Sequence, residues 1–298
     1  MKFGIDLGGS KTEILAIDDH GAEVYRQRVS TPKEDYPAIL NCIKDLVTNA
    51  ESSLSQTATV GIGTPGSLSP ATGLLRGSNS TCLNNTPFKQ DLEKLLKREI
   101  RISNDANCFA LSEAVDGAAR DADIVFGVII GTGCGAGIVI NQQVIDGPNR
   151  ISGEWGHNPL PWPDDNELQS TSCWCGQQGC IETFLSGPAL EQDYQDTVAD
   201  YISAKDIISL AEQGDEVSQQ IVARYESRMA RSLAHIINIL DPHTIVLGGG
   251  MSNVKRLYEN VPRLWKEFIF SDAVATRLVP PVHGDASGVR GAAWLWND

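Results

Sequence analysis

Short apolar runs separated by turn residues predict that the chain begins with a three-stranded β-meander. The runs cover residues 3–7, 14–17 and 24–29, and the turns between them cover residues 8–10 and 18–21. Glycine, serine and aspartate favour such turns because their backbones or side chains suit turn geometry. The N-terminal segment is therefore expected to begin a β-sheet.

The next part of the chain alternates between helical and strand patterns. Apolar residues at helical spacing predict a helix around residues 39–47, and further leucines predict a second helix around residues 92–96. Buried strands are expected at residues 59–63 and 100–103, and a helix is expected to open near Ala106. This alternation of strands and helices is typical of α/β proteins.

The second half contains a loop-rich stretch between about residues 147 and 187, and helices are expected from about residue 188. Its longest helical pattern covers residues 217–240 and ends at Asp241-Pro242, because proline cannot continue a helix. A buried strand is predicted at residues 244–247, and a terminal helix at residues 285–296.

Residues 3–17 align without a gap on residues 126–140, at an offset of 123. Both copies have an apolar strand that begins Phe-Gly, a glycine-rich turn and a second apolar strand. A duplicated half explains this similarity, although two unrelated hairpins with similar turns remain an alternative. Asp6 aligns with Ile129, so this position of the fold accepts an apolar residue.

Composition and charge narrow the function classes. The 298 residues include 24 Lys plus Arg and 38 Asp plus Glu, which gives a formal charge of −14, and no basic cluster suits a nucleic-acid phosphate backbone. The N-terminus does not resemble a secretory signal, and no apolar stretch is long enough to span a membrane. We therefore expect a cytoplasmic protein of about two domains, with no nucleic-acid or membrane partner.

Two glycine-rich turns are candidates for phosphate binding. The turns are expected to present backbone N–H groups across a cleft, with glycine needed for positive φ and for close approach of an anion. Neither turn matches a Walker loop or opens a helix as a dinucleotide fingerprint does, and ligand-free tight turns are the alternative. The first turn is expected to comprise Gly8, Gly9, Ser10, Lys11 and Thr12, and the second Gly131, Thr132, Gly133, Cys134, Gly135 and Gly137.

Asp6 is a carboxylate within an otherwise apolar strand, which is costly to bury unless the group has a role. Holding a hydrated Mg²⁺ beside a phosphate is a suitable role. Lys11 could contact a phosphate or be an ordinary surface residue of the turn.

Cys173, Cys175 and Cys180 form a C-x-C-x4-C pattern, and His157 lies in the same loop-rich region. Three thiolates and one imidazole suit a closed structural Zn²⁺ site; a set of reduced, metal-free cysteines is the alternative. Such a metal would hold the nearby Glu154 and Glu182 in place, where they could bind sugar hydroxyls or simply be exposed.

Asp105 lies between a predicted strand and a predicted helix. It could be only the N-cap of the helix. It could also be a general base, because attack of a hydroxyl group on a γ-phosphoryl group needs an acceptor for the hydroxyl proton.

Several of these motifs together resemble the ROK sugar kinases. The motifs are DLGGSK at 6–11, NDAN at 104–107, GTGCGAG at 131–137, GEWGH at 153–157, CWCGQQGCIE at 173–182 and HGDASGVRGA at 283–292. The stretches NSTCLN at 79–84 and GHNPLPW at 156–162 look most like the bacterial fructokinase branch, which also accepts mannose. Ser10 departs from the threonine that is usual in the family but keeps its hydroxyl group.

The resemblance implies an α/β, actin-like ATPase (ribonuclease H-like) fold, with two lobes and a duplicated core around an ATP cleft, and a homodimer. The expected N-terminal lobe is 1–116, completed by a C-terminal helix at 285–298. The expected C-terminal lobe is 117–284 and includes the zinc-binding loop.

The resemblance also implies roles for individual residues. Asp105 is the base that deprotonates the sugar 6-hydroxyl. The sugar contacts are Gly66, Asn104, Asp105, Glu154, His157 and Glu182, and His157 also binds zinc through its other ring nitrogen. Besides the two turns and Asp6, the nucleotide contacts are Gly4, Ile5, Leu7, Ala136, Gly248, Gly249 and Gly250.

We therefore expect an ATP- and Mg²⁺-dependent hexose 6-kinase with a structural Zn²⁺, acting on D-fructose and also on mannose. An N-acetylglucosamine or glucose kinase of the same family is the alternative. A sugar-responsive ROK repressor is a further alternative, but it would need an N-terminal helix-turn-helix, whereas the phosphate turn lies within the first ten residues.

Overall fold

The computed structural model describes residues 1–168 and 171–297, which form two compact units. The first unit contains Met1–Asp121, Gly137–Ser152 and the segment from Val282 to the C-terminus; the second contains Ala122–Ala136 and Gly153–Pro281. The boundary expected after residue 116 lies at residue 121, and residues 137–152 belong to the first unit. Asp298, the end of the expected C-terminal helix, lies outside the described residues.

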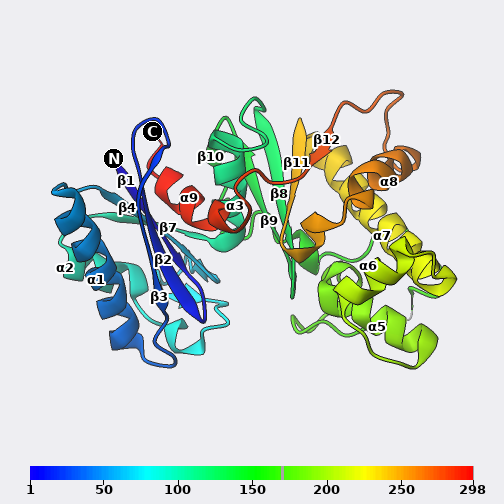
Figure 1. Ribbon diagram of the computed structural model, residues 1–298, viewed down its shortest axis with the longest axis horizontal. Helices are drawn as coiled ribbons and strands as arrows, with labels where there is room; N and C mark the ends of the chain where they lie inside the picture. The colour runs from blue at the N-terminus through cyan, green and yellow to red at the C-terminus, as the bar shows by residue number, and fades with distance from the viewer. Residues whose placement is uncertain (169–170, 298) are drawn as a thin grey trace. The chain divides into compact units, whose positions relative to one another are not determined.

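The first unit is built on a five-stranded mixed sheet of order β3-β2-β1-β4-β7 (Figure 1). Strands β1 (Lys2–Leu7), β2 (Lys11–Ile17) and β3 (Glu23–Ser30) form the antiparallel meander expected from the sequence. Strands β4 (Thr59–Thr64) and β7 (Ile100–Asn104) continue the sheet in parallel with β1. A small hairpin joins β5 (Ser67–Leu68) and β6 (Leu75–Arg76).

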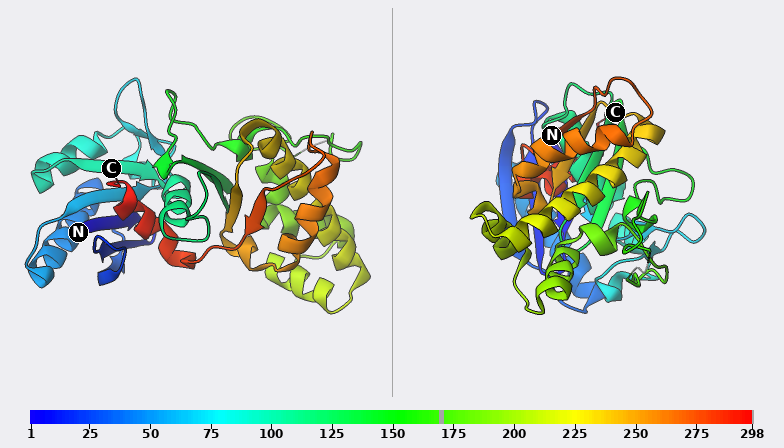
Figure 2. Two further views of the ribbon diagram at one scale, coloured as in Figure 1. Left: turned by 90° about the horizontal axis from the view of Figure 1, so that it is seen from above. Right: turned by 90° about the vertical axis from the view of Figure 1, so that its right-hand side faces the viewer.

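Helices cover both faces of this sheet (Figures 1 and 2). Helices α1 (Tyr36–Leu54) and α2 (Phe88–Leu96) bury their apolar faces in one core with Phe3 and Ile5. Helices α3 (Asp105–Val115) and α9 (Ser287–Trp294) pack together on the other face. A Cβ added to Gly4 would lie 2.0 Å from the carbonyl oxygen of Val289, so α9 sits directly on β1.

The second sheet has the order β10-β9-β8-β11-β12. Its strands are β8 (Ile124–Ile130), β9 (Cys134–Ile140), β10 (Gln143–Val144), β11 (Thr244–Gly248) and β12 (Arg277–Val279). Strands β8, β11 and β12 are parallel, and β10 is antiparallel to β9. The chain passes from the second unit into the first within β9.

Helices make up much of the second unit. They are α4 (Glu182–Leu185), α5 (Gly187–Val198), α6 (Ala204–Glu212), α7 (Glu216–Leu240) and α8 (Arg256–Leu264). Helix α7 matches the longest helical pattern of the sequence. Its last residue is Leu240, and the C-cap Asp241 has a left-handed φ of 47°, which stops the helix. Short 3-10 turns occur at Thr81–Leu83, Trp155–His157, Gly250–Asn253, Trp265–Glu267 and Gly284–Ala286.

The two sheets repeat one topology, which confirms the duplicated core. In each sheet the next strand along the chain lies on one side of the first strand, and two strands parallel to the first lie on the other side. β2 and β9 begin and end at the offset of 123 residues found in the sequence. Asp6 pairs with Gly63 of β4, and its counterpart Ile129 pairs with Gly248 of β11.

The predicted terminal helix is shorter than expected. Residues 284–286 form a 3-10 turn, and α9 begins only at Ser287 and ends at Trp294. The side chain of Ser287 donates a hydrogen bond to Glu113 of α3 at 2.8 Å, which fixes the start of α9 against α3.

In the described part of the chain, no helix is long and apolar enough to cross a membrane.

Candidate active site

In the first unit, the expected sugar and phosphate residues gather where three parallel strands end. Asp6 lies near the end of β1, Gly66 two residues beyond the end of β4, and Asn104 at the end of β7. The carboxyl ends of parallel strands are the usual location of ligand sites in α/β sheets. The sheet therefore brings residues from three distant parts of the chain to one edge.

Asp105 is not the N-cap of α3. That role belongs to Asn104, whose side chain accepts a hydrogen bond from the N–H of Asn107 at 2.7 Å. Asp105 is the first residue of the helix and accepts from the N–H of Ala106 at 2.8 Å. The structure therefore removes the capping explanation and leaves this carboxylate available for chemistry.

The carboxyl groups of Asp105 and Asp6, both in the first unit, have raised pKa values. Desolvation raises the pKa of Asp105, although its side chain still reaches solvent, and the hydrogen bond from Ala106 acts in the opposite direction. Burial, followed by the nearby charges of Asp105 and Glu13, raises the pKa of Asp6 from 3.8 to about 6. A buried carboxylate whose ionisation is disfavoured by a neighbouring carboxylate is a suitable setting for a divalent cation.

The first glycine turn is tight, but not for the expected reason. The N–H of Gly8 donates to the carbonyl of Lys11 at 3.0 Å, and neither Gly8 nor Gly9 has a positive φ. A Cβ on Gly8 would instead lie 3.0 Å from the carbonyl oxygen of Lys11. Close approach of the backbone, and not left-handed geometry, therefore requires glycine at this position.

The side chains around this turn divide into exposed and buried sets. Ser10 and Lys11 are exposed, so their side chains can reach a ligand. Ile5 and Leu7 are buried in the core, and the buried Thr12 hydroxyl is hydrogen-bonded to that of Thr31 at 2.8 Å. The side chains of these three residues therefore serve the fold, and a nucleotide contact at any of them would have to use the backbone.

A hollow of about 320 Å³ in the first unit lies beside this turn. It is lined by Gly9, Thr31, Asn79 and Ser80, among others. The stretch 79–84, which looks most like the fructokinase branch, thus lies against the first turn.

The second glycine turn, in the second unit, also lacks positive φ angles. The N–H of Gly131 donates to the carbonyl of Gly133 at 3.0 Å. A Cβ on Gly133 would lie 2.5 Å from Glu182 Oε2, so this glycine makes room for a carboxylate 49 positions later in the chain. Cys134, Ala136 and Gly137 are buried, and Gly137 packs against the backbone of α3.

A cavity of about 850 Å³ in the second unit brings together Gly131, Thr132 and Gly250. One face of α6 also lines it; no motif in the sequence marks this face, although the spacing of its residues is helical. Gly249 has a φ of 76°, and its Cβ would lie 2.3 Å from the carbonyl of Ile130. The α6 residues in the cavity are Ala204, Lys205, Ile208, Ser209 and Glu212.

The predicted metal ligands come together in the second unit. One ligand atom from each of His157, Cys173, Cys175 and Cys180 lies within 4.8 Å of the other three. The Sγ atoms of Cys175 and Cys180 are 3.6 Å apart, as are Cys173 Sγ and His157 Nδ1. Tetrahedral zinc with Zn–S bonds of about 2.3 Å separates two sulfur ligands by about 3.8 Å, so the four residues fit the ion.

The expected sugar contacts of the second unit surround this cluster. Glu182 Oε2 accepts from the N–H of Cys134 at 2.9 Å, and Oε1 accepts from the indole N–H of Trp174 at 2.7 Å. Glu154 is exposed and immediately precedes the 3-10 turn Trp155–His157. Since the Nδ1 atom of His157 faces the cysteines, its Nε2 atom is available to a ligand.

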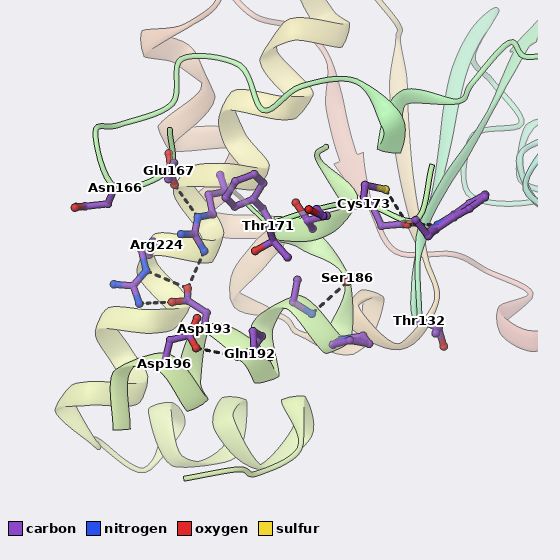
Figure 3. A pocket seen from close by; sticks show the side chains of 18 of the residues that line it. Thr132, Asn166, Glu167, Thr171, Cys173, Ser186, Gln192, Asp193, Asp196 and Arg224 are labelled. Carbon is purple, nitrogen blue, oxygen red and sulfur yellow. Dashed lines mark hydrogen bonds and ion pairs between the residues drawn. The ribbon is translucent and has the colours of Figure 1, made fainter. Parts of the chain in front are cut away.

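A second cavity of the unit, about 590 Å³ in volume, is lined by polar and charged side chains (Figure 3). Glu182, Trp174 and Thr132 lie on its wall together with an ionic network of loop and helix residues. Arg228 bridges Glu167 and Asp193, with N–O distances of 2.7 Å to each, and Arg231 also binds Glu167 at 2.9 Å. This network ties the loop before the metal site to α5 and α7.

Comparison with known proteins defines the class. The model of the ROK family matches residues 2–298, so the chain belongs to the ROK family. Its fold is the actin-like ATPase fold of ROK kinases, as the resemblance implied.

Three relatives are similar over nearly their full length. The N-acetyl-D-glucosamine kinase of Haemophilus influenzae is 40% identical over 308 residues, covering 99% of both chains. The structure of a ROK hexokinase from Thermus thermophilus has a TM-score of 0.89 at 27% identity, covering 99% of this chain and 97% of the other. A ROK glucokinase from Streptomyces griseus, in complex with glucose and AMPPNP, has a TM-score of 0.76 at 25% identity, covering 98% and 97%. These relatives place the chain among the sugar kinases of the family.

Proposed function

We propose that the protein transfers the γ-phosphoryl group of ATP to the 6-hydroxyl of a hexose. The single observation that carries the proposal is the environment of Asp105. Asn104 caps α3, so the carboxylate of Asp105 is not needed for capping; it directly follows β7 and has a raised pKa. A carboxylate with a raised pKa is a stronger base than one at its ordinary value. Asp105 would accept the hydroxyl proton as the oxygen attacks the phosphorus.

The glycine turns and the 850 Å³ cavity support a nucleotide site. The wall of this cavity includes Ile130, Ile208 and Met251, and Gly131 and Thr132 lie at one side. An apolar cavity suits a nucleobase, and backbone N–H groups of a tight turn suit phosphates. Mg²⁺ would neutralise charge on the transferred phosphate, and Asp6 is the residue placed to hold its hydration shell.

The zinc cluster supports sugar binding and not the phosphoryl transfer itself. Four protein ligands complete a tetrahedral shell, which leaves no open position for substrate. The metal would fix the ring of His157 and the loop that carries Trp174 and leads to Glu182. The proposed sugar contacts are Gly66, Asn104, Glu154, His157 and Glu182.

Two observations bear on the identity of the hexose. The relative from Haemophilus influenzae, at 40% identity, is named an N-acetyl-D-glucosamine kinase, and this favours N-acetyl-D-glucosamine as the acceptor. The stretches at residues 79–84 and 156–162 look like the fructokinase branch and favour D-fructose. We take N-acetyl-D-glucosamine as the first candidate, because a full-length relative supports it, and D-fructose as the second.

A coupled assay of ADP release decides between them. The purified protein is supplied with ATP, Mg²⁺ and one of N-acetyl-D-glucosamine, D-fructose, D-mannose or D-glucose, and the product is analysed by mass spectrometry. We expect one of the first two sugars to give the highest kcat/KM and a 6-phosphate product. ADP release that does not depend on any of the four sugars would contradict the proposal.

A further inference from the structure

Trp174 is an exposed indole in the metal loop. It lies between the metal-ligand candidates Cys173 and Cys175, and 77% of its surface is exposed. A tryptophan this exposed buries too little area for core packing to explain its presence. The role of this side chain must therefore come from its contacts in the metal loop.

The indole touches two of the proposed sugar contacts. Its N–H donates to Glu182 Oε1 at 2.7 Å, and its ring meets the ring of His157 edge to face, with 4.9 Å between the centroids. A hydrogen bond to a charged acceptor is stronger than one between neutral groups. Trp174 thus links the metal loop to the carboxylate of Glu182.

Each oxygen of Glu182 accepts one short hydrogen bond, and the thiol of Cys173 makes an additional long contact of 4.0 Å with Oε1. Trp174 holds Oε1, and the N–H of Cys134 holds Oε2 at 2.9 Å. An ionised carboxylate has about four acceptor positions, so each oxygen keeps capacity for a ligand hydroxyl. Both Glu182 and Trp174 also line the 590 Å³ cavity, so this edge of the carboxylate is open to a small molecule.

We propose that Trp174 is a positioning residue for the sugar: its indole N–H holds Glu182 in the orientation in which both oxygens can accept from two hydroxyls. The inference rests on the proposed function, because it needs Glu182 to be a sugar contact. Without the indole N–H, only the Oε2 atom of Glu182 would keep a short hydrogen bond, from the N–H of Cys134, and the carboxylate could rotate about it. Sugar affinity would then fall, because the carboxylate must be ordered each time that the sugar binds.

Calorimetric titration of the zinc-loaded protein with N-acetyl-D-glucosamine and with D-fructose tests the proposal. The variants are Trp174→Phe, which removes the donor, and Trp174→Tyr, which keeps a ring with an O–H donor. Trp296→Phe is the matched control, because it also removes an indole donor, which is bound to the carbonyl of Val60 at 2.8 Å, at the opposite end of β4 from Gly66. Zinc content and melting temperature are measured for every protein.

We expect W174F to weaken binding of the substrate sugar, the one that the enzyme phosphorylates, by about tenfold. The KM for this sugar should rise, and kcat should stay within about twofold of wild type. W174Y should keep most of the affinity, and W296F all of it. In the Glu182→Ala background, W174F should change the affinity less than about twofold, because the two residues act as a unit.

Three results would overturn the proposal while leaving the kinase function intact. They are unchanged affinity in W174F, equal losses in W174F and W174Y, and loss of zinc in W174F, which would make Trp174 a structural part of the metal loop. A wild-type protein that neither binds nor phosphorylates a hexose would overturn the proposed function, and the inference with it.

Discussion

At the scale of single residues, the clearest result is the division of labour between Asn104 and Asp105. From the sequence alone, Asp105 is equally well explained as a helix cap and as a base. The structure gives the cap to Asn104, which accepts from the N–H of Asn107. The spacing of the two residues could not decide this, because both Asn and Asp are good N-caps and helix boundaries shift by a residue.

The raised pKa of Asp105 predicts an acid limb in the pH profile of the enzyme. A base must be deprotonated to act, so kcat/KM should rise with pH through the pKa of Asp105. We expect the midpoint to lie above 3.8, the ordinary value of an aspartate. Initial rates between pH 4 and 8, with stability checked at each pH, test this; a flat profile over that range would count against Asp105 as the base.

At the scale of elements, the ionic network behind the metal loop makes a separate prediction. Burial raises the pKa of Glu167, but hydrogen bonds from Arg231 and Arg228 outweigh it and lower the pKa from 4.5 to about 2. The network thus stabilises the folded state above pH 4.5, and this contribution is lost as the pH falls towards 2. The side chains of Glu167 and Arg231 are 2% and 7% exposed, so solvent screens the pair little.

We therefore expect Glu167→Gln to lower the free energy of unfolding at pH 7 by roughly 3 kcal/mol. The difference from wild type should shrink between pH 4.5 and 2. Urea unfolding followed by circular dichroism measures both. Asp121→Asn is the control, since its carboxylate is 86% exposed and should contribute less than about 0.5 kcal/mol. Equal stability of E167Q and wild type at pH 7 would show that the network is not stabilising.

The metal loop gives the second prediction at this scale. Cys175→Ala removes one of four ligands, and we expect zinc bound per chain to fall strongly, together with the melting temperature and the sugar affinity. Zinc analysis, thermal melting and sugar titration follow the three effects. Cys42→Ala is the matched control, because Cys42 is a half-buried cysteine of α1 outside the cluster. Unchanged melting and unchanged KM in C175A would contradict a role of the metal in folding the sugar site.

At the scale of the whole molecule, the sequence predicts the parts of the fold that follow from local patterns. The repeat at an offset of 123 anticipates two sheets with one topology, and the cysteine spacing anticipates the cluster with His157. Both depend on short-range order along the chain. The compact units are harder to predict, because residues 137–152 pack with the first unit although they follow the first strand of the second sheet.

Contacts between distant segments explain most of what the sequence did not reveal. Gly133 is a glycine because the carboxylate of Glu182 lies against it, and not because of its φ angle. The α6 face in the 850 Å³ cavity and the bond between Trp174 and Glu182 likewise depend on tertiary packing. No motif marks these residues, so only the three-dimensional arrangement identifies them.

The central claim is a sugar kinase that uses Asp105 as its base, and Asp105→Asn tests it most directly. The variant keeps the shape of the side chain but cannot accept the hydroxyl proton as a carboxylate does. With the best hexose of the coupled assay, we predict that kcat falls at least about 100-fold, while the melting temperature and sugar affinity stay close to wild type. A folded D105N protein that phosphorylates the sugar at a rate near wild type would contradict the account.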